Sequence, residues 1–224
     1  MRSVAFLFDN DGVLIDSSEL HWRSWEMLME NEPLLKMDKK GFEGGFGMRN
    51  DLILQRLFPN IAAETRAQWA EKKEKLFRTI AAGVITLLPG MEAFLAQVVA
   101  AKIPHIIASS TPLANLELFI SSTVLGKYFE DYLSAETVMH GKPAPDIFIA
   151  AAHHLGFEPE RCIVFEDAPA GIQAGKAAGC FVVALATTHT QAQLANCDLI
   201  YPSAHELNLH EILDAFNQWT QKTK

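Results

Sequence analysis

Short, uninterrupted apolar runs alternate with helix-like segments along most of this 224-residue chain. A strand that is apolar at every position is typical of a parallel sheet whose two faces are both covered. The alternation with helices therefore predicts an α/β fold with a Rossmann-like parallel sheet as its core. The predicted strands are Val4–Phe8, Pro104–Ala108, Tyr132–Leu133, Cys162–Phe165, Phe181–Leu185 and Leu199–Ile200.

Helical periodicity and helix-end signals fill the intervals between these runs. Pro112 and Pro145 stand just before two of the segments, where proline is favourable. Gly179 is a C-terminal cap signal after another segment. The predicted helices of this part of the chain are Met91–Ala101, Leu113–Ser121, Asp146–Leu155 and Gly171–Ala178.

The stretch Ser17–Leu87 departs from this alternation. It contains long helix-like segments, Ser18–Glu30 and Ala62–Ala81, and no convincing strand. An insertion of this kind between the first strand and the remaining ones predicts a separate helical module, the cap. The predicted division is a helical cap domain of residues 17–86 and an α/β core domain of residues 1–16 and 87–224.

Charge and cysteine content narrow the classes of partner. The net charge is −8 and no Lys/Arg cluster offsets it, which disfavours nucleic acid. No stretch approaches the roughly 20 apolar residues that span a membrane, and Val4–Phe8 is too short for a signal peptide. Three cysteines without a C-x-x-C pair argue against a disulfide framework or a zinc site. We therefore expect a cytoplasmic protein without nucleic-acid or membrane partners.

Acidic residues follow the first and fourth predicted strands. Asp9 and Asp11 come directly after the first run, and Gly12 allows a sharp turn there. In open α/β sheets, ligands bind at the carboxyl ends of the strands. Taken alone, this segment is equally compatible with an ordinary capped turn. Glu166 and Asp167 follow the fourth predicted strand, where carboxylates are costly to bury unless they are paired or bind a metal.

Hydroxyl groups and one lysine complete the set. Ser109, Ser110 and Thr111 lie at a predicted helix start, where hydroxyls and free N–H groups can bind an anion. In isolation, such a sequence is more often a simple helix cap. Lys142 lies in a proline-containing loop that suits a charge held inward. Hard oxygen ligands, a lysine and hydroxyls at one edge of a sheet suit Mg²⁺-assisted phosphoryl transfer.

Four motifs in this order resemble the haloacid dehalogenase-like (HAD) superfamily. More narrowly, the chain is similar to the subfamily of β-phosphoglucomutase and sugar-phosphate phosphatases, which has a helical cap. The combination is far more specific than any one motif and covers nearly the whole chain, with the cap matching least. The motifs are D-N-D-G-V-L-I-D-S (Asp9–Ser17), A-S-S-T (Ala108–Thr111), G-K-P-A-P-D-I-F (Gly141–Phe148) and E-D-A-P-A-G-I-Q-A-G (Glu166–Gly175).

The resemblance implies catalytic roles. Asp9 would attack phosphorus and form an aspartyl-phosphate. Asp11 would protonate the leaving oxygen and then activate water. Ser109 and Lys142 would hold the transferring phosphoryl oxygens.

The resemblance also implies Mg²⁺ as the cofactor. Asp11 would contribute its backbone carbonyl to the metal, and Ser110 and Thr111 are expected to contact the substrate. The implied metal ligands are Asp9, Asp11, Asp167 and Glu166.

The cap offers two further candidates for contact with the substrate. His21 falls where the family carries a His that controls entry into the site, although a solvated helical His is an open alternative. Arg49 resembles the family's cap Arg, which grips a second phosphate or another anionic group, with a surface salt bridge as the alternative.

The mutase also carries a cap lysine, and the aligned position lies near Phe77. The lack of a lysine there disfavours a mutase. We interpret Lys72–Lys75 as a solvated helix face.

Three hypotheses for the function follow. The first is a Mg²⁺-dependent phosphohydrolase of a small phosphorylated metabolite, such as a sugar phosphate, acting through an aspartyl-phosphate. The second is a β-phosphoglucomutase. The third, of another class, is a non-catalytic HAD-fold protein that binds a phosphorylated metabolite. The resemblance favours a monomer.

Overall fold

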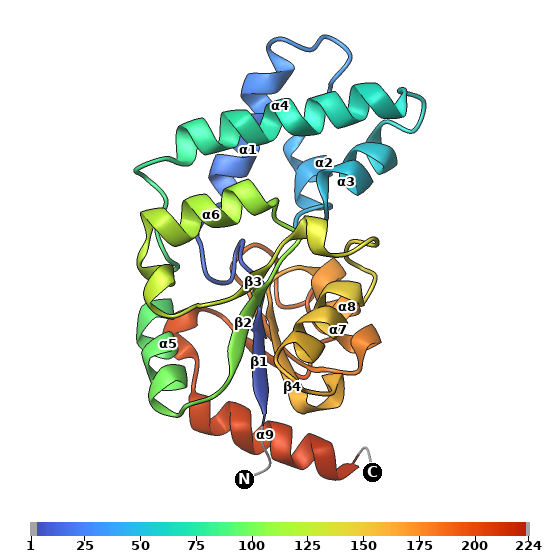
Figure 1. The fold of residues 1–224 in the computed structure, drawn as a ribbon. Helices are drawn as coiled ribbons and strands as arrows, with labels where there is room; N and C mark the ends of the chain where they lie inside the picture. Colours follow the sequence, from blue (N-terminus) through green and yellow to red (C-terminus); the bar gives the residue numbers. More distant parts are fainter. Residues whose placement is uncertain (1–3, 223–224) are drawn as a thin grey trace.

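The computed structural model describes residues 4–222, and its centre is a parallel sheet (Figure 1). Within this range the sheet has six strands in the order β3-β2-β1-β4-β5-β6. The α/β fold class is therefore confirmed, and each predicted strand is present to within one residue at either end. The strands are β1 (Ala5–Phe8), β2 (His105–Ala108), β3 (Tyr132–Leu133), β4 (Cys162–Glu166), β5 (Phe181–Leu185) and β6 (Leu199–Tyr201).

Helices cover both faces of the sheet, and a further group lies beyond one of its edges (Figure 1). The helices predicted from the sequence are present with ends shifted by at most two residues, while α2, α3 and α9 were not predicted. The α-helices are α1 (Ser18–Met29), α2 (Lys39–Glu43), α3 (Asn50–Leu57), α4 (Ala63–Ala81), α5 (Met91–Ala100), α6 (Leu113–Ser122), α7 (Asp146–His154), α8 (Pro169–Ala178) and α9 (Leu209–Lys222). The short 3₁₀ helices are η1 (Val124–Lys127), η2 (Ala135–Thr137), η3 (Pro159–Arg161) and η4 (Ala204–Glu206).

Strand β1 occupies the middle of the sheet and is buried on both faces. Side chains alternate along a strand, so Phe6 and Phe8 point to one face while Ala5 and Leu7 point to the other. On the first face, Phe8 stacks on Phe165 with ring centroids 4.5 Å apart. This packing holds β1 between β2 and β4, and with it the position of Asp9, which follows β1 directly.

Helices α1–α4, here called the cap helices, lie beyond the carboxyl ends of the strands (Figure 1). They have a hydrophobic cluster of their own, which includes Trp25 and Trp69. The segments that join them to the rest of the chain run side by side, with hydrogen bonds from Asp16 N to Thr86 O and from Leu88 N to Leu14 O.

Helix α4 also reaches the main core, because its residue Phe77 packs edge-on against Phe119 of α6. The domain boundaries at 16/17 and 86/87 stay a prediction, and residues 1–3 and 223–224 of that division lie outside the described range. Within residues 4–222, no helix is long and apolar enough to cross a membrane.

The aromatic core beneath β1 sets the stability of the sheet. Phe94 of α5 is buried against Phe8 and Phe165. We expect Phe94→Ala to lower the free energy of unfolding by about 3–5 kcal/mol in urea denaturation, because it leaves a cavity in a close-packed core. Val99 lies on the same helix and is exposed, so Val99→Ala should change stability by less than about 0.5 kcal/mol. Equal effects of the two substitutions would contradict this description of the core.

Candidate active site

The sheet topology brings the predicted site residues together. Asp9 follows β1, Ser109 follows β2, and Glu166 and Asp167 lie at the end of β4. Because β2, β1 and β4 are adjacent and parallel, their carboxyl ends meet at one edge. Lys142 reaches the same point from the loop before α7.

Lys142 is completely buried and lies between two carboxylates. Its Nζ is 2.8 Å from Asp9 Oδ1 and 2.6 Å from Glu166 Oε1. Burial alone would lower the pKa of Lys142, but Asp9 and Glu166 raise the pKa above its ordinary value. Lys142 is therefore a fixed positive charge, held rigidly against the carboxylate of Asp9.

Asp9 and its acidic neighbours carry more negative charge than this lysine can offset. Burial raises the pKa of Asp9 to about 7; Lys142 acts in the opposite direction and Glu166 adds to the rise. The pKa of Asp167 is also well above its usual range, because of burial and then the nearby charges of Glu166 and Asp9. Lys142 thus compensates only part of the negative charge of this cluster.

The same cluster fits a hard divalent cation. Ligand oxygens of Asp9, Glu166 and Asp167 lie within 4.8 Å of one another. Asp167 Oδ1 is buried without a hydrogen-bond partner, a costly situation that a bound cation would relieve. Carboxylate oxygens suit Mg²⁺, Mn²⁺ or Ca²⁺.

The side chain of Asp11 is turned away from this cluster and towards the cap helices. Its Oδ1 accepts hydrogen bonds from Ser17 Oγ at 2.5 Å and His21 Nε2 at 3.1 Å, and its Oδ2 accepts one from Thr111 Oγ1. Burial raises the pKa of Asp11, but His21 and the bonds from Ser17 and Thr111 outweigh burial and hold the pKa below its ordinary range. A contribution of the Asp11 backbone carbonyl to a metal site stays a prediction.

The hydroxyl residues after β2 line the space next to Asp9 and Asp11. Ser109 is buried, and its Oγ lies 2.9 Å from Thr111 Oγ1. Ser110 and Thr111 face the same cavity. The structure therefore places all three hydroxyls where the sequence predicts them, at the start of α6.

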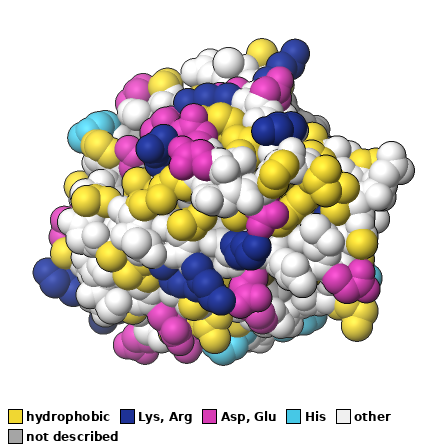
Figure 2. Space-filling model, turned by 90° about the horizontal axis from the view of Figure 1, so that it is seen from above, with side chains coloured by type: hydrophobic (Ala, Val, Ile, Leu, Met, Phe, Trp, Pro, Cys, Tyr) yellow, Lys and Arg dark blue, Asp and Glu magenta, His cyan; other side chains and the backbone are white. Residues whose placement is uncertain are grey.

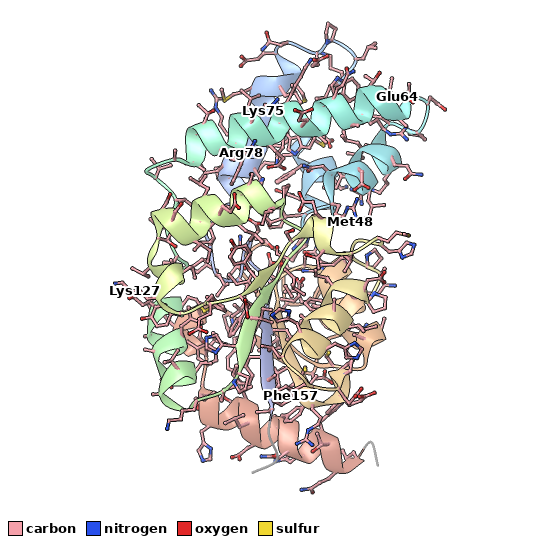
Figure 3. All side chains as sticks on the ribbon, viewed as in Figure 1. Met48, Glu64, Lys75, Arg78, Lys127 and Phe157 are labelled. Carbon is pink, nitrogen blue, oxygen red and sulfur yellow. The ribbon has the colours of Figure 1, made fainter. Side chains whose placement is uncertain are left out.

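A cavity of about 290 Å³ separates this sheet edge from the cap helices. Its size is at the lower end of the range of about 300–1,000 Å³ for small-molecule pockets. Met48 lies where the chain between the cap helices α2 and α3 approaches the core, as Figure 3 shows. The core lines the cavity with Asp9, Asp11, Ser109, Ser110, Thr111, Pro112 and Ala135. The cap contributes His21, Trp25, Phe42, Phe46, Gly47, Met48, Arg49, Asn50, Asp51, Ile53, Ala67, Ala70, Lys73 and Glu74.

His21 is buried in this cavity and does not face solvent. Its ring stacks on Phe77 with centroids 3.9 Å apart, and its Nδ1 lies 2.5 Å from Nζ of Lys73. Lys73, His21 and Asp11 thus form a continuous chain of polar contacts from α4 to the sheet edge. The structure thus contradicts the alternative of a solvated helical His, while a role of His21 in controlling substrate entry stays a prediction.

The interpretation of residues 72–75 as a solvated helix face is wrong for its two central residues. Lys73 and Glu74 are buried and line the cavity, while Lys72 and Lys75 are exposed. Figure 3 labels Lys75 on α4. The reason is helical periodicity: Trp69, Lys73 and Phe77 recur every four residues and face the same side.

This spacing also corrects the position expected for a cap lysine. Lys73, one helical turn before Phe77, is the lysine that reaches the site. The absence of a lysine at Phe77 therefore does not count against a mutase.

Arg49 lines the cavity with its donors already engaged. Its Nε and Nη2 donate to the two carboxylate oxygens of Asp51 at 3.1 and 3.0 Å. Its Nη1 donates to the backbone carbonyls of Val138 and Met139 in the core. Arg49 thus contacts both the cap and the core.

Two polar contacts of the site escaped the sequence analysis. Ser17 lies inside the first motif but received no role, although a hydroxyl six residues after Asp11 can reach back to it across a turn. Thr188 donates its hydroxyl to Asp167 Oδ2. The signal in the sequence is a threonine shortly after β5, because β1, β2 and β4 are each followed by polar residues of the site in the same way.

The chain is similar to known hydrolases over most of its length. A family model described as "Hydrolase: haloacid dehalogenase-like hydrolase" matches residues 4–179. Hexitol phosphatase A of Escherichia coli (strain K12) is 34% identical over 215 residues, covering 93% of this chain and 95% of that protein. Beta-phosphoglucomutase of Bacillus subtilis (strain 168) is 30% identical over 224 residues, covering 96% of each. The solved structure of a HAD hydrolase, family IA, variant 3, from Entamoeba histolytica HM-1:IMSS has a TM-score of 0.86 at 28% identity, covering 96% of this chain and 99% of that one.

Removal of the buried lysine should destabilise the fold in a pH-dependent way. In the absence of divalent cations, we expect Lys142→Met to cost about 3–5 kcal/mol at neutral pH, because it leaves buried carboxylates uncompensated. In the folded variant these carboxylates retain protons more strongly than in the unfolded chain, so stability should recover as the pH falls towards about 5. Urea denaturation at both pH values measures this difference.

Lys176→Met is the matched control. Lys176 also pairs with a carboxylate, that of Asp198, but lies partly exposed, so its loss should cost at most about 1 kcal/mol at either pH. A Lys142→Met variant as stable as this control would show that the buried cluster does not depend on Lys142.

Proposed function

The chain belongs to the haloacid dehalogenase-like hydrolases and is a phosphatase of that family, and we propose that it hydrolyses a small sugar or polyol phosphate with Mg²⁺ through an aspartyl-phosphate on Asp9. One observation carries the proposal. The Asp9 carboxylate lies at the floor of a small cavity, beside a buried lysine and two further carboxylates that fit a cation. This arrangement combines a nucleophile with positive charge for an incoming phosphoryl group.

In the first step, Asp9 forms a bond to phosphorus and the bond from phosphorus to the leaving oxygen breaks. Lys142 and Ser109 hold the phosphoryl oxygens, since both lie beside Asp9 at the sheet edge. Mg²⁺ held by Asp9, Glu166 and Asp167 would add positive charge against the same oxygens and would favour ionised Asp9. Attack requires this ionised form. With a pKa of about 7, a substantial fraction of Asp9 is ionised at neutral pH.

Asp11 transfers the protons. The bound phosphate ester brings negative charge next to Asp11 and raises its pKa, which allows Asp11 to carry the proton that the leaving oxygen receives. In the second step, Asp11 removes a proton from water, the water oxygen bonds to phosphorus, and Asp9 is released. The hydrogen bonds from Ser17, His21 and Thr111 fix the orientation of Asp11 for both transfers.

A small phosphorylated metabolite is the substrate class that the cavity and the relatives support. The cavity lies between the cap and the sheet edge and measures about 290 Å³, which suits a monosaccharide-sized molecule. One relative is a hexitol phosphatase and another a β-phosphoglucomutase.

A second candidate function is that of a β-phosphoglucomutase, which passes the phosphoryl group from Asp9 to a sugar in place of water. The specific observation that favours it is the contact chain from Lys73 through His21 to Asp11. Cap residues that contact the acid–base group can delay hydrolysis until a sugar is bound.

Asp9→Asn should abolish turnover. Wild-type chain should release phosphate from p-nitrophenyl phosphate with Mg²⁺ and lose this activity with excess chelator, while Asp9→Asn should be slower by on the order of 10³-fold or more. Asp16→Asn, an exposed carboxylate of the same segment, is the control and should retain activity. Full turnover by Asp9→Asn would refute the covalent mechanism.

The two candidate functions differ in the fate of the phosphoryl group. With β-glucose 1-phosphate and a trace of glucose 1,6-bisphosphate, a phosphatase yields glucose and inorganic phosphate, whereas a mutase yields glucose 6-phosphate. We expect free phosphate to be the main product in an assay that follows both. Predominant formation of glucose 6-phosphate would replace the hydrolase proposal with the mutase.

A further inference from the structure

The cap half of the cavity is electrically balanced. Four charged residues of the cap line it: Arg49 and Lys73 are basic, and Asp51 and Glu74 are acidic. Each basic residue is paired with an acidic one, Lys73 with Glu74 at 2.8 Å and Arg49 with Asp51 at 3.0 Å. The face of the molecule on the cap side likewise shows acidic and basic side chains next to one another (Figure 2).

Glu74 is held in place as a buried carboxylate by both the cap and the core. Asn50 and Lys73 donate to its Oε1 at 2.6 and 2.8 Å, and Asn115 of α6 donates to its Oε2 at 2.5 Å. Burial raises the pKa of Glu74, but Lys73, His21 and the hydrogen bonds outweigh burial and bring the pKa down to about 2. Glu74 is therefore fully ionised near neutral pH.

The position of Asn115 is fixed in turn by a second residue of α4. Arg78 Nη1 donates to Asn115 Oδ1 at 2.8 Å, and Figure 3 shows Arg78 on the helix that crosses α6. The Asn115 amide thus uses its oxygen for Arg78 and its nitrogen for Glu74. This orientation keeps a donor directed at Glu74 and holds the carboxylate against the cavity.

We propose that Glu74 and Asp51 are specificity-determining residues, which neutralise the cap side of the pocket and select a substrate with one phosphate and an uncharged polyhydroxyl remainder over a bisphosphate. This inference rests on the proposed function, because it takes the phosphate at Asp9 as the reacting one. Beyond that function, the inference specifies which kind of molecule fills the rest of the cavity.

The physical reason is the desolvation of a second phosphate. A dianion moved into this cavity would lose part of its water and would meet lysine and arginine charges that carboxylates already offset. Hydroxyl groups cost much less to desolvate than a dianion, and they can form hydrogen bonds with ion pairs and amides. The aromatic side chains of Trp25, Phe42 and Phe46 line the same space and suit the carbon skeleton of a polyol or sugar.

The experiment compares binding of two sugars that differ by one phosphate. Fructose 6-phosphate and fructose 1,6-bisphosphate are titrated by calorimetry into the full chain carrying Asp9→Asn, with Mg²⁺, so that turnover does not interfere. Sorbitol 6-phosphate serves as a second monophosphate. The readout is the ratio of the dissociation constant of the bisphosphate to that of the monophosphate.

We expect this ratio to exceed about 10 in the Asp9→Asn chain. Addition of Glu74→Gln should lower the ratio by about tenfold, since it removes one carboxylate and keeps the side-chain volume. Asp51→Asn should lower it in the same direction by a smaller factor, because Asp51 is exposed and screened by solvent. Asp51 lies at the rim, so its variant tests the proposal even if Glu74→Gln fails to fold.

Glu71→Gln is the matched control, an exposed carboxylate on the same helix paired with Lys75. The ratio should be the same with and without it. A ratio that does not change in Glu74→Gln and Asp51→Asn, or changes equally in Glu71→Gln, overturns the proposal, as does the failure of both monophosphates to bind. Because binding is measured without turnover, absence of phosphatase activity in the wild-type chain would refute the proposed function and leave the selection by charge standing.

Discussion

The whole site depends on one buried ion cluster, in which Lys142 neutralises part of the charge of Asp9 and Glu166. Buried charges are tolerated only when partners surround them closely. The parallel sheet meets this requirement because β1 and β4 are neighbours that end at the same level, so their carboxylates are forced together. Lys142 offsets some of the repulsion between them and leaves Asp167 Oδ1 without a partner. The carboxylate charge that Lys142 does not offset makes this sheet edge suitable for a cation. A cation and Lys142 together would suit a phosphoryl group.

The core could be predicted from the sequence because its physics is local and periodic. Strands buried on both faces have no polar positions, so runs such as Cys162–Phe165 were recognisable, and their ends located Asp9 and Glu166. The terminal helix α9 was missed although Ile212 and Phe216 are four residues apart and buried. In the cap, the prediction for Lys73 was wrong for a different reason. Lys73 is charged, and a charged residue within a helix is ordinarily solvated. The four-residue spacing of Lys73 and Phe77 marks this side of α4 as buried, but the contact with His21 that accommodates a buried lysine is tertiary.

Closure of the cavity rests on residues that touch both halves of the molecule. Arg49 bonds to carbonyls of the core loop at Val138 and Met139, and Asn115 bonds to Glu74 and Arg78 of α4. These contacts are polar, and they lie beside the apolar contact of Phe77 with Phe119. Polar contacts of this kind exchange readily with water, so they suit an association that forms and breaks during each cycle of substrate entry and product release.

The contact of His21 with Asp11 couples the position of the cap to the protonation of Asp11. His21 comes from α1 of the cap, whereas Asp11 is fixed in the core beside β1. With His21 in place, the pKa of Asp11 is held low against the effect of burial. Withdrawal of α1 removes that contact and also admits water, which relieves the burial that raises the pKa. Loss of the His21 contact would raise the pKa of Asp11 and hydration would lower it, so the protonation of Asp11 depends both on that contact and on the water that α1 excludes.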